Sequence, residues 1–105
     1  MGNITVSDNV ITEIAYRSIC NIYGVDQNNK EFKRQRKNIS IERTPEDNVV
    51  INLKLEIPYG ENIIEFCKNI MKSVSENVTQ MTDKVVEAVN VTVVNIFEKQ
   101  VEDQQ

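Results

Sequence analysis

The side chains that most often carry out catalysis or bind metals are scarce in this sequence. Histidine is absent, which removes the commonest general base and metal ligand and every Ser-His or Cys-His nucleophile arrangement. The two cysteines, Cys20 and Cys67, lie far apart without a CxxC spacing, so the chain offers too few sulfur ligands for a zinc site. We therefore expect no enzyme activity, no metal and no cofactor.

Carboxylates occur in two groups that could be read as paired acids. The first group is Glu42, Glu46 and Asp47, and the second is Glu61 and Glu65. Nothing in the surrounding sequence would bury either group, so the pattern does not indicate the tuned carboxyl pKa that acid-base catalysis needs. We interpret both as surface charge, with the second favoured by the positive end of a helix dipole.

One basic segment is the candidate binding surface of the sequence. It covers residues 30–37 and contains Lys30, Phe32, Lys33, Arg34, Arg36 and Lys37. Such a cluster could contact the phosphates of a nucleic acid or an anionic lipid surface. The alternative, which we favour, is a solvated loop. The net charge of −4 and the pI of about 4.8 argue against nucleic-acid binding by the domain as a whole but do not exclude a local basic patch. No GxxG loop and no aromatic RNA-binding strand motif is present, so nucleic acid is not an expected partner.

Two stretches have the apolar spacing of amphipathic helices. Residues 8–23 follow capping candidates and end before Gly24, which is typical of a Schellman stop. Residues 61–81 carry a longer apolar stripe that includes Cys67, Met71 and Met81, and we expect these three side chains in the core. Cys20 lies at the edge of the first stripe, where we expect partial exposure.

The remaining apolar segments predict strands. Residues 49–57 alternate strictly between apolar and polar side chains, which indicates one buried face and a hairpin with residues 39–43. Residues 3–6 and 85–97 complete the set, and the polar stretch 26–38 is expected to be a loop. The order β-α-β-β-α-β predicts an α+β fold, a two-layer sandwich with a mixed sheet of about four strands and two helices on one face.

The last strand is the second candidate contact surface. Residues 85–97 are rich in β-branched side chains, with apolar residues on parts of both faces. Val94 and Ile96 are expected on the face opposite Val89 and Val91. If the strand lies at a sheet edge, its unpaired backbone favours pairing with another chain. We therefore expect a homo-oligomer, with Val94 and Ile96 as its contact residues.

Five segments in order resemble the alkaline shock protein family, the envelope stress response proteins of Gram-positive bacteria. They are ITVSDNVITEIA, IYGV, VVINLKLEIPYG, VTQMTD and VVEAVNVTVV, within about residues 3–97. The chain departs from the family pattern at Asp83, where the family has glycine, and at residues 95–98. We expect a single alkaline-shock-type domain over residues 1–98, followed by a polar C-terminal tail over residues 99–105.

The resemblance implies a non-enzymatic stress-response protein of the cell envelope, acting as a structural or adaptor protein through protein–protein contacts and self-association. Family members lie beneath the membrane, held by a membrane-anchored partner, and some are linked to lipid metabolism. The sequence itself shows neither a signal peptide nor a transmembrane segment, so we expect the cytoplasm, at the inner face of the membrane through a partner. Two alternatives stay open: a small nucleic-acid-binding module using residues 30–37, and a regulatory subunit of a lipid-synthesis enzyme.

Overall fold

The central strand organises the fold in the computed structural model, which describes residues 1–98. This strand is β2 (Val49–Pro58), and its alternating apolar side chains, Val49, Ile51, Leu53, Leu55 and Ile57, are all buried. On one side β2 pairs antiparallel with β1 (Ile39–Arg43), and on the other it pairs parallel with β3 (Val86–Phe97). The sheet order is β1-β2-β3, so the predicted hairpin and the predicted parallel crossover are both confirmed.

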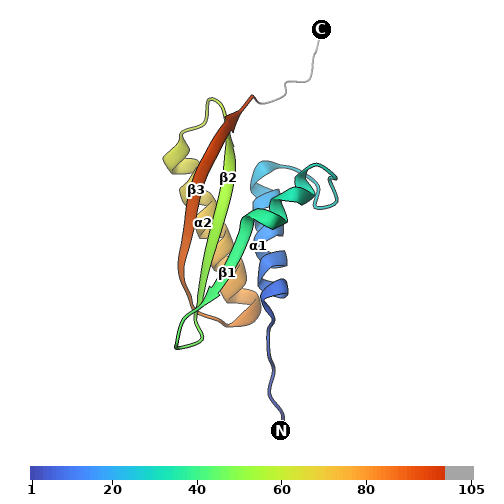
Figure 1. Ribbon diagram of the computed structural model, residues 1–105, viewed down its shortest axis with the longest axis vertical. Coiled ribbons are helices and arrows are strands. Elements are labelled where there is room, and N and C mark those ends of the chain that lie inside the picture. The colour runs from blue at the N-terminus through green and yellow to red at the C-terminus, as the bar shows by residue number, and fades with distance from the viewer. Residues whose placement is uncertain (99–105) are drawn as a thin grey trace.

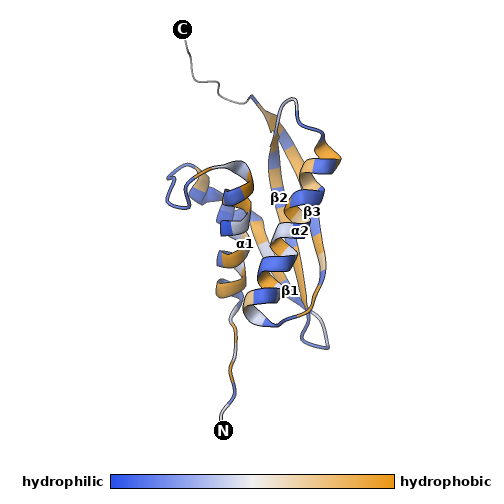
Figure 2. Ribbon diagram, turned by 180° about the vertical axis from the view of Figure 1, so that it is seen from behind, coloured by the Kyte–Doolittle hydropathy of each residue, from blue (hydrophilic) through white to orange (hydrophobic). Residues whose placement is uncertain are grey.

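Two helices cover one face of this sheet (Figures 1 and 2). They are α1 (Asp8–Tyr23), which packs against β1 and α2, and α2 (Ile63–Thr82), which connects β2 to β3 and packs along β3. Their apolar stripes face the sheet. The core between the helices and the sheet is mainly aliphatic and also contains Tyr16, Cys20 and Cys67. The predicted α+β architecture with both helices on one face is therefore confirmed.

The helix ends follow local side-chain and backbone chemistry. Asn62 caps the start of α2, where its Oδ1 accepts a hydrogen bond of 2.9 Å from the backbone N–H of Glu65. Gly24 ends α1 at φ 70°, a left-handed conformation that glycine adopts without steric cost. Asp83 ends α2 in the same region at φ 59°. An L side chain is disfavoured there, although Asp and Asn tolerate it better than most residues.

The prediction of about four strands is wrong in one place. Within residues 1–98 the sheet has three strands, because residues 3–6 form no strand (Figure 1). Ile4 is 95% exposed, and a four-residue segment has few apolar side chains whose burial could offset the entropy of ordering it. The predicted polar tail, residues 99–105, lies outside the described residues.

Three smaller expectations also differ from the structure. The predicted loop over 26–38 contains a short 3-10 helix, η1 (Phe32–Asn38). Cys20 is 3% exposed, not partly exposed as expected, because it packs within the hydrophobic core cluster. Met81 is 70% exposed and so is not a core residue. It sits on the last turn of α2, where the stripe faces a groove beside α1 and no longer faces the sheet.

Candidate interaction surfaces

The aromatic side chain of the basic segment packs inward. The ring centroid of Phe32 lies 6.1 Å from that of Tyr16 and 5.2 Å from that of Tyr23. Tyr23 also meets Phe66 edge-on at 5.3 Å, so four aromatic rings join η1 to both helices. Phe32 is consequently part of the fold, and its contacts with the tyrosines compete with any stacking on a nucleic-acid base.

Arg36 is also engaged within the domain. Its Nε and one terminal nitrogen each donate a hydrogen bond of 3.0 Å to the carboxylate of Glu13, and its guanidinium carbon lies 4.0 Å from the centre of the Tyr16 ring. The hydrogen bond from Arg36, with a second from Arg17, holds the pKa of Glu13 below its usual value. This fork geometry with a stacked ring fixes η1 against α1.

The other four basic residues of the segment remain at the surface. Lys30, Lys33, Arg34 and Lys37 are all exposed. The structure thus divides the predicted cluster into two inward-facing members and four exposed cations. The sequence showed the charges but carried no signal that Phe32 and Arg36 would face α1, because their partners Glu13, Tyr16 and Tyr23 lie on a distant stretch of chain.

The internal role of Arg36 gives a direct test. We expect Arg36→Ala to lower the free energy of unfolding by about 1–2 kcal/mol, because it removes a charge-assisted fork and a cation–π contact at a partly exposed site. The matched variant Arg34→Ala removes the same side chain at an exposed position and should change stability by less than about 0.5 kcal/mol. Urea unfolding of both variants measures the difference, and equal losses would contradict this assignment.

The second predicted surface, the last strand, does lie at the edge of the sheet. β3 pairs with β2 on one side, and none of the described residues pairs with its other side. Val94 is 53% exposed and Ile96 is 46% exposed. A register shift between Leu55 and Glu56 breaks the alternation before Ile96, which pairs with Ile57. The two predicted contact residues are thus accessible. The expected face is wrong for Ile96, because the shift places it beside the buried Ile57 and therefore on the same face as Val89 and Val91.

A row of polar side chains crosses the open face of the sheet. Asn90 on β3 donates a hydrogen bond of 3.0 Å to Oδ1 of Asn52 on β2, and Asn52 donates one of 2.8 Å to Glu42 on β1. The row ends with Asn90 on the edge strand, where the side chain is exposed. Sequence reasoning missed it, since the register that aligns the three residues depends on long-range pairing. The only signal in the sequence was that Glu42, Asn52 and Asn90 each lie at a polar position within a segment of alternating polarity.

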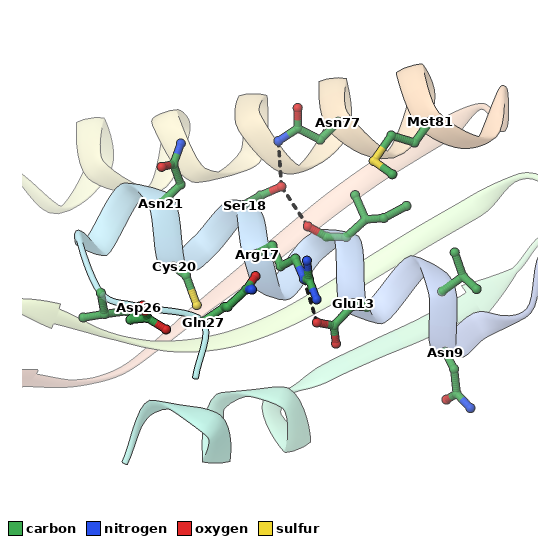
Figure 3. Close-up of a pocket in the computed structure, with 13 residues that line it drawn as sticks. Asn9, Glu13, Arg17, Ser18, Cys20, Asn21, Asp26, Gln27, Asn77 and Met81 are labelled. Carbon is green, nitrogen blue, oxygen red and sulfur yellow. Dashed lines mark hydrogen bonds and ion pairs between the residues drawn. The ribbon is translucent and has the colours of Figure 1, made fainter. Parts of the chain in front are cut away.

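An open groove of about 720 Å³ lies between α1, α2 and the loop after α1 (Figure 3). Ser18 donates a 2.9 Å hydrogen bond to the carbonyl of Ile14 and accepts one of 2.8 Å from Asn77 across the groove floor. Cys20 also lines it, and burial raises the pKa of its thiol. Every buried side-chain nitrogen or oxygen in the described part of the chain has a partner, so no unsatisfied group is aimed at a ligand.

Within residues 1–98, no three histidine, cysteine or acidic side chains converge closely enough to hold a metal ion. Over the same described range, neither helix combines the length and apolar character that crossing a bilayer requires.

These features define a small two-layer α+β domain whose most distinctive surface is the open edge and face of its sheet. The chain belongs to the alkaline shock protein 23 family, described as having a cell envelope-related function, because the model of that family matches residues 1–98. The resemblance found in the sequence is thereby confirmed. No curated protein and no solved structure matches the chain.

Proposed function

We propose that this chain is a non-enzymatic structural or adaptor protein of the cell envelope that works through protein–protein contacts and self-association. The single observation that carries the proposal is the free edge of β3. It is a twelve-residue strand with no pairing partner on its outer side among the described residues. Such an edge is a template for adding a strand from another chain.

The composition of β3 supports this use of the edge. Natural proteins usually protect a free edge with lysine, proline or inward charges. β3 contains no lysine, arginine or proline, and Glu87 is its only charged residue. The register shifts near its two ends leave a regular stretch between them. This stretch is the part of the sheet where another strand could pair with the fewest obstacles.

The family description and the sequence also bear on where the protein acts. We propose that residues 1–98 act as one domain in the cytoplasm, at the inner face of the membrane, through a membrane-anchored protein partner. Support comes from the family's envelope-related function and from the lack of a spanning helix in the described part of the chain. The absence of histidine and of a converging acid cluster in residues 1–98 supports a role without catalysis.

Charge at the exposed edge tests the proposal. We expect the double variant Val94→Lys, Ile96→Lys to weaken self-association at least tenfold, because lysines disfavour strand addition at a sheet edge. Light scattering coupled to size exclusion measures the mass over a range of concentrations. Ile64→Lys, on α2 and 63% exposed, is the control that adds a lysine elsewhere and should leave the mass unchanged. A wild-type protein that is monomeric at every concentration tested would remove the self-association part of the proposal.

A further inference from the structure

We infer that the partner of the β3 edge is a second copy of this chain, paired antiparallel with Asn90 opposite Asn90. The result is one continuous sheet in the order β1-β2-β3-β3-β2-β1, with all four helices on the same face. This inference rests on the proposed self-association and adds the direction and register of pairing.

The polar row on the open face of the sheet ends at Asn90 on the edge strand. Asn90 uses one N–H of its amide to reach Asn52, which leaves its second N–H and its carbonyl oxygen able to bond elsewhere. Directly opposite side chains of an antiparallel pair lie about 4.5–5.5 Å apart on the same face. Two facing Asn90 amides can therefore exchange N–H···O bonds. The row from Glu42 to Asn90 then continues without a break into the second copy.

The alternation of side chains between the two faces of β3 restricts the register of pairing. Val89, Val91 and Val93 pair with the buried residues of β2, so they face the helices, whereas Ala88, Asn90 and Thr92 face the open side. Opposite residues in a β-ladder share a face. Registers that oppose odd to even positions would place valines against polar residues on the wrong side. A register centred on a residue places valines opposite valines on the helix side and polar residues opposite polar residues on the open side. A register centred between two residues does not.

The regular part of β3 limits where a symmetric pair of strands can be centred. Pairing between β2 and β3 is uninterrupted from Ala88 to Val93, and register shifts lie on either side. A symmetric pair that uses this stretch is centred on Asn90 or on Val91. Centring on Asn90 opposes Val89 to Val91 and Ala88 to Thr92, and it alone brings the two amides together. Centring on Val91 would oppose Asn90 to Thr92 and break the amide pair.

One feature opposes the pairing. The groove between α2 and β3 is lined by Lys68 and Lys72, with Glu87 as its only acid. The antiparallel arrangement brings both copies of this groove to the helix side of the seam, so four lysines face a shared space. Salt screens such repulsion, and we expect the dimer to tighten when NaCl is raised from 50 to 500 mM. A dimer that weakens with salt would contradict this arrangement.

Disulfide trapping resolves the register. An equimolar mixture of Ala88→Cys and Thr92→Cys proteins, carrying tags of different size, should give a mixed cross-linked dimer under mild oxidation, because these positions are opposite only when Asn90 is the centre. The matched mixture of Ala88→Cys with Val94→Cys should cross-link poorly, since those positions are opposite only when Val91 is the centre. Cys20 and Cys67 are 3% and 8% exposed, so the native thiols should not contribute bands.

A single charge tests the amide pair. Asn90→Asp places two carboxylates face to face and removes the donor to Asn52, so we expect the dimer dissociation constant to rise at least tenfold. Asn95→Asp is the matched control on the same strand, because its Oδ1 only accepts a bond, from the N–H of Ile96, and Asp can still accept it. Equal effects of the two variants would overturn the Asn90 pairing.

The outcomes separate the two proposals. Cross-linking between positions 88 and 94 would support self-association but overturn this register. Cross-linking between like positions in two parallel strands would also support self-association but overturn the antiparallel direction. Deleting residues 2–6 tests the other available strand, the extended segment before α1. If the deletion abolishes the dimer, the occupant of the edge is that segment and the inference is wrong. If the intact chain never dimerises, the proposed self-association fails together with it.

Discussion

We expect Ile70→Ala to lower the free energy of unfolding by about 2–5 kcal/mol, the usual cost of removing a large buried aliphatic side chain. Ile70 lies on the inner face of α2 and is fully buried. Truncation removes its contacts and leaves a cavity between α2 and the sheet, which a closely packed core fills only in part. Urea unfolding followed by far-UV circular dichroism measures the loss. Each kcal/mol should also lower Tm by about 4–8 °C.

The same helix supplies the control. Ile64→Ala removes the same atoms from a side chain that is 63% exposed, and we expect a change within about 0.5 kcal/mol. Helix propensity acts alike on both variants, because alanine is the better helix former at either site. The difference between them therefore reports burial alone. If both variants lost equal stability, the face of α2 that packs on the sheet would have been assigned wrongly.

The second large effect is a loss of stability at alkaline pH. Burial raises the pKa of the thiols of Cys20 and Cys67, raises that of Tyr16 to about 12, and raises that of Tyr23. These groups are neutral when protonated, so the folded state retains protons that the unfolded chain releases first. Their contribution is fully present below the unfolded pKa values, near 9 for the thiols and near 10 for the tyrosines, and is lost as pH rises through the folded values.

The free energy of unfolding should consequently fall as pH rises from 9 towards 12. Each group that stays protonated only in the folded state adds at most about 1.4 kcal/mol per pH unit to this slope. Urea titrations at pH 7, 9, 10 and 11 measure it. A free energy that stays constant or rises over this range would contradict the burial of these four groups.

Two tyrosine variants locate the effect. Tyr16→Phe removes one of the ionising groups, so its stability should decline less steeply above pH 10. At neutral pH it should cost about 1 kcal/mol, because the Tyr16 hydroxyl donates a 2.9 Å hydrogen bond to the carbonyl of Gln27. Tyr59→Phe changes a ring that is 69% exposed and should leave the profile as it is in the unsubstituted protein. Parallel pH profiles for all three proteins would exclude Tyr16 as a contributor.

Local patterns in the sequence were sufficient for most of the fold. The alternation over 49–57 predicted β2 and its buried face, and the stripe over 8–23 predicted α1 with its glycine stop. The long stripe over 61–81 predicted α2 to within two residues at its start. These features are readable because periodicity and capping depend on residues a few positions apart. Whether the last strand lies at a sheet edge stayed open in the sequence, and the structure places β3 at the edge of the three-stranded sheet of the described residues.

The surfaces were less predictable from the sequence. Phe32 and Arg36 were identified as members of a basic binding segment, yet both pack against α1. Residues 3–6 were predicted as a strand on propensity alone, and they form none. Met81 continues an apolar stripe but faces the groove between the helices. In each case the outcome depends on which distant residue happens to be the neighbour, and no local pattern reports that.

By itself, the sequence determined the kind of element at each position, the absence of imidazole chemistry and the family to which the chain belongs. Tertiary structure alone decided which charges remain at the surface and which amides align across the sheet. The physical reason is the range of the interactions. Helix and strand periodicity are set by neighbours along the chain, whereas ion pairs, aromatic contacts and cross-strand rows form between segments that only folding brings together.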